Sequence, residues 1–140
     1  MQSSTLTLLI SVLVVGVLIF IAILLTSKRS HSFDTMEYQT SFLEIENNLI
    51  KDSKASYNMS VVNADKLLDK ALCEMGVPGK TMGERMKKLG NTKFSQTNAV
   101  WHAHKLRNQI AHEHNFQLDY NQAKHALSVY KQALKDLGAI

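Results

Sequence analysis

The stretch from Leu6 to Leu25 constrains the fold of this chain more than any other, because it contains no charged side chain. Only Thr7, Ser11 and Gly16 interrupt its apolar residues. At about 1.5 Å rise per residue, about twenty helical residues cover about 30 Å, the thickness of the hydrocarbon layer of a bilayer. The sequence therefore predicts a transmembrane helix over residues 6–26, preceded by a short extracytoplasmic N-terminus at residues 1–5.

The charges beside this stretch predict its orientation. Residues 1–5 carry no charged side chain, whereas Lys28 and Arg29 follow the apolar run directly. A cleaved signal peptide would instead have positive charge ahead of a shorter apolar core. By the positive-inside rule, we expect a single-pass protein of the cell membrane, with its N-terminus outside and its C-terminal domain in the cytoplasm. The basic segment 27–33 is then a juxtamembrane linker among the lipid headgroups.

Residues 34–140 are expected to form one domain. All charged residues of the 140-residue chain follow the apolar run, and about 110 residues is an ordinary size for a small domain. Cys73 is the only cysteine, so the chain cannot form an internal disulfide. This is typical of proteins in a reducing compartment.

The spacing of apolar residues in this domain is helical. Thr81 with Glu84, and Asp119 with Gln122, have the spacing of capping boxes that begin helices. No segment has the two-residue alternation of a strand. The sequence thus predicts an all-α fold, in which the transmembrane helix precedes a bundle of four to five helices at 34–140. Three apolar series follow the 3.6-residue period of a helix, namely Tyr38, Phe42, Ile45, Leu49; Val61, Ala64, Leu68, Leu72, Met75; and Ala123, Leu127, Tyr130, Leu134, Leu137.

Strongly polar side chains interrupt the apolar face of the helix expected over residues 99–112. On a helical wheel, Arg107 falls inside the apolar arc that includes Val100 and Leu106. An inward arginine needs a carboxylate, a carbonyl, a partner chain or an anionic ligand. Asn108 and His112 share one flank of the same helix with His104.

These residue types suit cleavage of RNA by its own 2′-hydroxyl, without a metal ion. A histidine can exchange a proton near neutral pH, and a fixed guanidinium can hold a phosphate and stabilise its developing charge. The predicted catalytic residues are His112 as acid or base, Arg107 as phosphate clamp and Asn108 as the group that orients the imidazole. One histidine supplies half of an acid/base pair, and the wheel separates Arg107 from His112 by about 140°. We therefore expect a homodimer that joins two half-sites.

Basic residues precede this motif. From Lys80 to His112 the chain has seven Lys and Arg side chains against Glu84 alone. Such a patch is typical of binding to an RNA backbone, although acidic lipid would respond to the same charge. The residues expected to contact RNA phosphates are Lys80, Arg85, Lys87, Lys88, Lys93, His104 and Lys105.

A purely structural interpretation of the motif stays open. Asp65 borders an apolar series and so needs a buried partner, and Arg107 can pair with Asp65 or Glu113. His112 can stabilise the end of its helix, where a positive charge is favoured. Pairs of histidines two positions apart, such as His112 and His114, do not share a helix face and are not joined by thiolates. The sequence therefore predicts no metal site and no cofactor.

The run Arg107-Asn108-Gln109-Ile110-Ala111-His112 resembles the R-N-x-x-x-H form of the signature of HEPN domains. HEPN domains are helical bundles, usually dimeric, in which this motif lies on a late helix and meets its copy across the interface. The resemblance implies a metal-independent endoribonuclease or, in diverged members, a nucleotide- or RNA-binding module. His114 stands where some HEPN toxins carry a modified tyrosine, which puts that mode of regulation in doubt. The wider sequence also resembles small bacterial proteins with one N-terminal membrane anchor.

Two functions follow from these observations. The leading one is a membrane-anchored HEPN-like protein that binds RNA through a dimeric Arg107 and His112 site; whether binding extends to cleavage is left open. The alternative is a non-catalytic helical interaction or scaffold module at the cytoplasmic membrane surface, which docks a protein partner or lipid.

Overall fold

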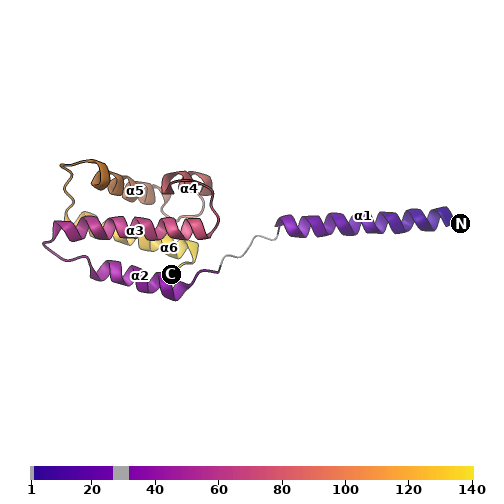
Figure 1. The fold of residues 1–140 in the computed structure, drawn as a ribbon, viewed down its shortest axis with the longest axis horizontal. Helices are drawn as coiled ribbons and strands as arrows, with labels where there is room; N and C mark the ends of the chain where they lie inside the picture. The colour runs from indigo at the N-terminus through magenta and orange to yellow at the C-terminus, as the bar shows by residue number, and fades with distance from the viewer. Residues whose placement is uncertain (1, 27–31) are drawn as a thin grey trace. The chain divides into compact units, whose positions relative to one another are not determined.

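The structure, a computed structural model, describes residues 2–26 and 32–140, with side chains at 6–22 and 32–140. The chain divides into two units, Met1–His31 and Ser32–Ile140. The first contains α1, and the second is a bundle of the other five helices (Figure 1). The helices are α1 (Gln2–Thr26), α2 (Thr35–Asn47), α3 (Lys54–Glu74), α4 (Met82–Leu89), α5 (Thr97–His112) and α6 (Tyr120–Leu137).

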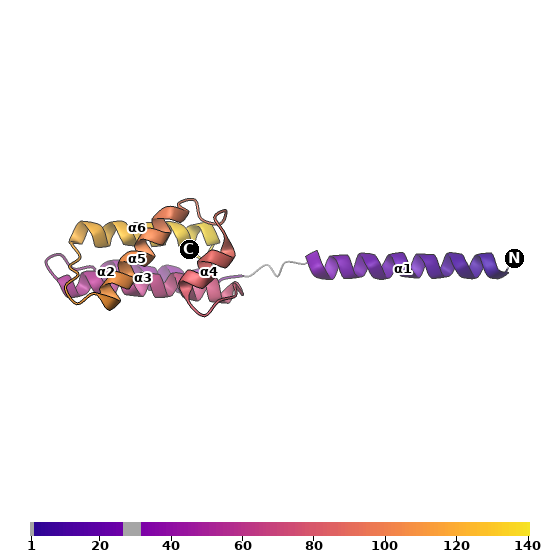
Figure 2. The ribbon, with the colours of Figure 1, turned by 90° about the horizontal axis from the view of Figure 1, so that it is seen from above.

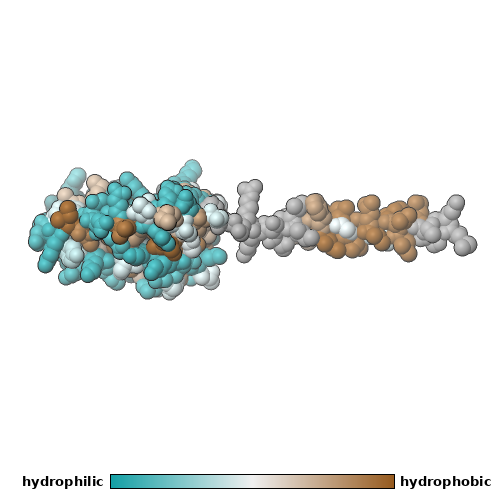
Figure 3. All heavy atoms as spheres, turned by 90° about the horizontal axis from the view of Figure 1, so that it is seen from below, coloured by the Kyte–Doolittle hydropathy of each residue, from teal (hydrophilic) through white to brown (hydrophobic). Residues whose placement is uncertain are grey.

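Helix α1 corrects the prediction made from the apolar run. Its exposed surface is hydrophobic (Figure 3), but no helix in the described parts of the chain is long and apolar enough to cross a membrane. The prediction of a transmembrane helix at 6–26 is therefore wrong.

The segments predicted to flank that helix are only partly described. Residues 2–5, predicted as part of an extracytoplasmic N-terminus, belong to α1, while Met1 lies outside the described residues. Of the predicted linker at 27–33, residues 27–31 also lie outside them.

The bundle confirms the prediction of an all-α fold of four to five helices at 34–140, since it has four longer helices and the short α4. Asp119 and Gln122 form a complete capping box at the start of α6. At the start of α4, the Thr81 hydroxyl accepts a hydrogen bond from the Glu84 N–H. The Glu84 carboxylate accepts from the N–H of Lys80 instead of that of Thr81, so this box is shifted by one residue.

Helix α3 is the centre of the bundle. It contacts α2, α4, α5 and α6. Figure 1 shows α2 on one side of α3 and α4 and α5 on the other, and Figure 2 shows α6 alongside α3. Val61, Leu68 and Leu72 on α3 are fully buried. Burying such a side chain stabilises a fold by about 1.5–3 kcal/mol. Leu49, expected to continue the first helix, lies just after α2 and still packs against the core.

A contact from α6 fixes the start of α5, which has no side-chain cap of its own. The backbone N–H and the hydroxyl of Ser95 each donate a hydrogen bond of 2.7 Å to the Asp136 carboxylate on α6. The Gln132 amide donates a third, at 2.8 Å. Burial acts to raise the pKa of Asp136, but these hydrogen bonds outweigh it and hold the pKa below its ordinary value.

Candidate functional site: a cleft between three helices

Helix α5 is buried only along its first half. Val100 and Ala103 are buried, whereas Leu106 and Ile110 are half-buried and Ala111 is exposed. The apolar arc predicted for this helix therefore covers the core at one end and reaches the surface at the other. The polar residues of the motif lie where α5 leaves the core.

A cleft of about 440 Å³ opens between α3, α4 and α5. Arg107, Asn108 and His112 of the motif lie on its lining together with His104, so the structure brings these four residues of α5 to one cleft within one chain. The wheel angle of about 140° between Arg107 and His112 does not prevent both from lining the same cleft. The rest of the lining is Asp65, Lys66 and Asp69 from α3, and Thr81 and Met82 from the start of α4.

Asp65 is the buried centre of this site, with only 3% of its surface exposed. One carboxylate oxygen lies 2.7 Å from Nδ1 of His104 and accepts a hydrogen bond of 2.9 Å from the Tyr130 hydroxyl. The other lies 3.5 Å from Nε of Arg107. A buried carboxylate is costly unless paired. Asp65 meets this requirement with groups from α5 and α6, and so joins both helices to α3.

The Tyr130 hydroxyl keeps its proton and donates a hydrogen bond to Asp65. Its side chain is fully buried, and burial, followed by the charge of Asp65 and their hydrogen bond, raises the pKa of its hydroxyl well above the ordinary value. The hydroxyl therefore stays protonated over the physiological range and holds the Asp65 carboxylate in place.

Arg107 has the partner that the structural interpretation offered, Asp65, and not Glu113. Its Nε is within ion-pair distance of the carboxylate but, among the described residues, has no hydrogen-bond partner. One Nη nitrogen donates a hydrogen bond of 3.2 Å to the Asn108 side chain. Asn108, predicted to orient an imidazole, thus contacts the guanidinium. With 28% of its side chain exposed, Arg107 still faces the cleft.

The two histidines of the cleft differ in their surroundings. His104 is largely enclosed, with 13% of its side chain exposed, and the ring of Trp101 packs edge-on against it. Its Nε2 lies near α4, 3.5 Å from where a Cβ would stand on Gly83. His112 is exposed in the last turn of α5. His104 was expected to contact phosphate. Its observed partner is Asp65, 39 residues earlier in the chain. The sequence indicated only that Asp65 needs a buried partner, not that His104 is that partner.

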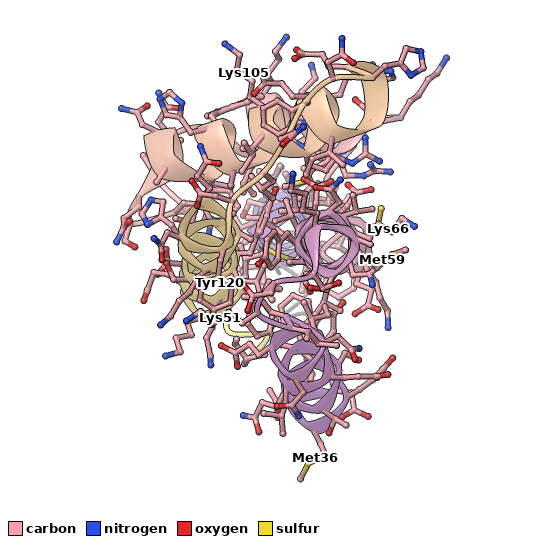
Figure 4. The ribbon with its side chains drawn as sticks, turned by 90° about the vertical axis from the view of Figure 1, so that its left-hand side faces the viewer. Met36, Lys51, Met59, Lys66, Lys105 and Tyr120 are labelled. Atoms are coloured by element: carbon pink, nitrogen blue, oxygen red, sulfur yellow. The ribbon has the colours of Figure 1, made fainter. Side chains whose placement is uncertain are left out.

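The basic residues expected to bind phosphate do not gather at the cleft. Arg85 is held by Asp69 at 2.9 Å, and Lys105 lines a second cleft of about 540 Å³ between α5 and α6. Lys66, which the sequence reasoning missed, lines the motif cleft itself. Figure 4 shows Lys66 and Lys105 on different sides of the bundle. The other residues of that prediction, Lys80, Lys87, Lys88 and Lys93, are exposed around α4.

Within the residues that the structure describes, no group of three or more His, Cys, Asp or Glu side chains is arranged to bind a metal ion. The comparisons with known proteins add no further constraint, since no family model, curated protein or solved structure matches this chain. The interpretation of the cleft therefore depends on its own residues.

Proposed function

We propose that this chain is a HEPN-like protein that binds RNA in the cleft between α3, α4 and α5 and cleaves it without a metal ion. The observation that supports the proposal most is the lining of this one cleft by Arg107, Asn108, His104 and His112. A guanidinium beside imidazoles suits phosphodiester cleavage by a 2′-hydroxyl, because it offers both charge stabilisation and proton transfer.

The charges at the cleft are nearly balanced. Its lining carries Lys66 and Arg107 against Asp65 and Asp69. Arg85, which lies outside the lining, pairs with Asp69, so the cluster including Arg85 has three positive charges against two negative ones. The guanidinium of Arg107, whose side chain is partly exposed, is held on one side by Asp65 and on the other by Asn108. A positioned guanidinium loses less entropy on binding a phosphate than a free one. In this proposal Arg107 binds the scissile phosphate and stabilises the charge that develops on it.

The reaction is a transfer within the RNA strand. A base removes the proton of a 2′-hydroxyl, and the oxygen attacks the adjacent phosphorus. The bond to the 5′-oxygen breaks and that oxygen takes a proton from an acid, which leaves a 2′,3′-cyclic phosphate and a 5′-hydroxyl. Each positioned acid or base typically contributes about 10²–10⁴-fold to the rate.

The test is incubation of the full-length chain with a mixed pool of RNA in the presence of a chelator. Arg107→Ala and His112→Ala should each lose cleavage, and Arg107→Lys should recover only part of it, because lysine lacks the planar guanidinium. His102→Ala is the matched control, since His102 is exposed on α5 and lines the other cleft. RNA left intact by the unaltered chain, or cut equally well by all variants, would refute the nuclease.

A second function is supported by the cleft between α5 and α6. Its floor is largely apolar, with Ala103, Leu106, Ala126 and Val129, and apolar concave surfaces are typical of binding sites. A non-catalytic interaction module would dock a second copy or another protein there. Sedimentation of the unaltered chain and of Leu106→Asp tests this. If the chain self-associates and Leu106→Asp abolishes the association while Arg107→Ala cleaves no less RNA than the unaltered chain, the module is favoured over the nuclease.

A further inference from the structure

We propose that His104, oriented by Asp65, is a second acid/base residue of this cleft, so that one chain supplies both proton-transfer groups of RNA cleavage. This inference rests on the proposed function and adds a residue to it. The sequence placed one catalytic histidine in each chain and required a second chain for the other. The structure places two imidazoles on the lining of one cleft.

The contact with Asp65 fixes the chemical form of His104. Nδ1 lies 2.7 Å from the carboxylate, which favours a proton on Nδ1 and leaves Nε2 as the nitrogen with a free lone pair. The carboxylate itself cannot turn away, because the Tyr130 hydroxyl and Arg107 hold it from α6 and α5. A buried carboxylate behind an imidazole also stabilises the imidazolium that forms when Nε2 takes a proton.

The order of residues along α5 places the phosphate clamp between the two imidazoles. His104 precedes Arg107 by three residues and His112 follows Asn108 by four, so these groups lie on adjoining turns. Eight helical residues separate the Cα atoms of the two histidines by about 12 Å along the axis. A phosphate bound at Arg107 therefore has His104 toward the start of α5 and His112 toward its end.

The two histidines then have different roles. Nε2 of His104 takes the proton of the 2′-hydroxyl, and the 2′-oxygen forms its bond to phosphorus. As the bond from phosphorus to the 5′-oxygen breaks, the His112 imidazolium gives its proton to that oxygen. His104 ends protonated and His112 neutral, and exchange with water restores both. His104 is the suitable base because Asp65 orients it, and exposed His112 is free to follow the departing strand.

The pH dependence of cleavage distinguishes a catalytic His104 from a structural one. The charged and titratable groups around it are Asp65, Lys66 and Asp69 on α3, Arg85 on α4, Tyr130 on α6, and Arg107 and His112 on α5. Cleavage needs neutral His104 and protonated His112, so the unaltered chain should show a bell-shaped profile. Loss of the base removes the acidic limb, and loss of the acid removes the alkaline limb.

His104→Asn is the decisive variant, because the asparagine amide can still donate to Asp65 from nearly the position of Nδ1 while Nε2 is removed. The full-length chain is assayed on RNA with chelator between about pH 4.5 and 8.5, at concentrations where sedimentation shows a monomer. We expect His104→Asn to lose about 10²-fold or more in rate together with the acidic limb. His112→Asn should lose the alkaline limb, and His102→Asn should leave rate and profile unchanged.

The outcomes separate this inference from the function on which it rests. No cleavage by the unaltered chain, or cleavage that ignores Arg107→Ala, refutes the proposed function. Cleavage that needs Arg107 and His112 but is as fast and as bell-shaped in His104→Asn refutes the role of His104 alone. If His104→Asn does not fold, Tyr130→Phe, which removes another partner of Asp65 but no imidazole, is compared with Asp65→Asn. Equal rates and unchanged profiles in these two variants would show that the cluster is structural, and a lower rate with a displaced acidic limb in Asp65→Asn alone supports the inference.

Discussion

The cluster around Asp65 makes a sharp prediction about stability that does not depend on any activity. Asp65→Ala removes a carboxylate that is 3% exposed and leaves three groups without their acceptor: the Tyr130 hydroxyl, the His104 ring and the Arg107 guanidinium. Breaking a buried ion pair from one side costs about 3–5 kcal/mol. Because His104 and Arg107 reach the cleft and its water, we expect a loss of about 3–4 kcal/mol, toward the lower end of this range.

Substitution of Tyr130, alone and together with Asp65→Ala, checks this prediction. Tyr130→Phe alone removes one hydrogen bond to a charged acceptor and should lower the free energy of unfolding by about 1.5–2 kcal/mol. In the Asp65→Ala background the hydroxyl has lost its acceptor in a fully buried place, which costs about 1–3 kcal/mol. Removing it there should therefore stabilise the protein. The same substitution is expected to change sign between the two backgrounds.

Urea unfolding of the full-length chain measures both effects. Trp101 is the only tryptophan and its ring packs beside His104, so its fluorescence reports on the bundle and not on α1. A total free energy of unfolding of about 5–15 kcal/mol is usual for a domain, which leaves room to measure the double variant. A loss below about 1 kcal/mol for Asp65→Ala, or additive effects of the two substitutions, would refute the account of Asp65 as a buried hub.

Further predictions concern the ends of helices and the extremes of pH. Gly83→Ala should stabilise the fold by up to about 1 kcal/mol, because a Cβ at this helical position meets only ordinary van der Waals contacts. Gly79→Ala should lower the melting temperature, because φ at Gly79 is +156° and a Cβ there would lie 2.9 Å from a backbone nitrogen. Asp119→Ala should cost about 1 kcal/mol in urea unfolding through loss of the cap of α6. Because its pKa is lowered in the folded chain, the Asp136 carboxylate stabilises the fold above its unfolded pKa of about 4, and this stabilisation is lost as the pH falls. Asp136→Asn should therefore be less stable than the unaltered chain at pH 7. Near pH 2 the two should be nearly equally stable. Because the pKa of the Tyr130 hydroxyl is raised in the folded chain, this hydroxyl ionises at a lower pH in the unfolded chain. The free energy of unfolding should therefore fall above about pH 10. The fall should be smaller in Tyr130→Phe.

The helices of the bundle could be predicted because their signals are local. The spacing of Tyr38, Phe42 and Ile45 reflects one buried face, and all three are in the core. The cap at Asp119 needs only the residue three positions later. The transmembrane prediction also used local signals, the length and the lack of charge of one run, but no helix in the described parts of the chain is long and apolar enough to cross a membrane.

The site could be predicted only in part, because its pairs are distant in sequence. A buried acid on an apolar face predicted that Asp65 needs a partner, and the possible pairing with Arg107 was among those considered. The contacts of Asp65 with His104 and Tyr130 join residues 39 and 65 positions apart, which no periodicity reveals. The charge of the run after Lys80 suggested one basic patch, but the fold pairs Arg85 with Asp69 and turns Lys105 to another cleft.

Cleavage of an oligonucleotide that carries a single ribonucleotide within DNA tests the central claim most directly. The full-length chain, with chelator present, should cut only after that ribonucleotide and leave a 2′,3′-cyclic phosphate, and Arg107→Ala should abolish the cut. An all-DNA strand of the same sequence should stay whole, because it lacks the attacking hydroxyl. Cutting of the DNA strand, products that end in a 5′-phosphate, or an undiminished rate in Arg107→Ala would contradict the account.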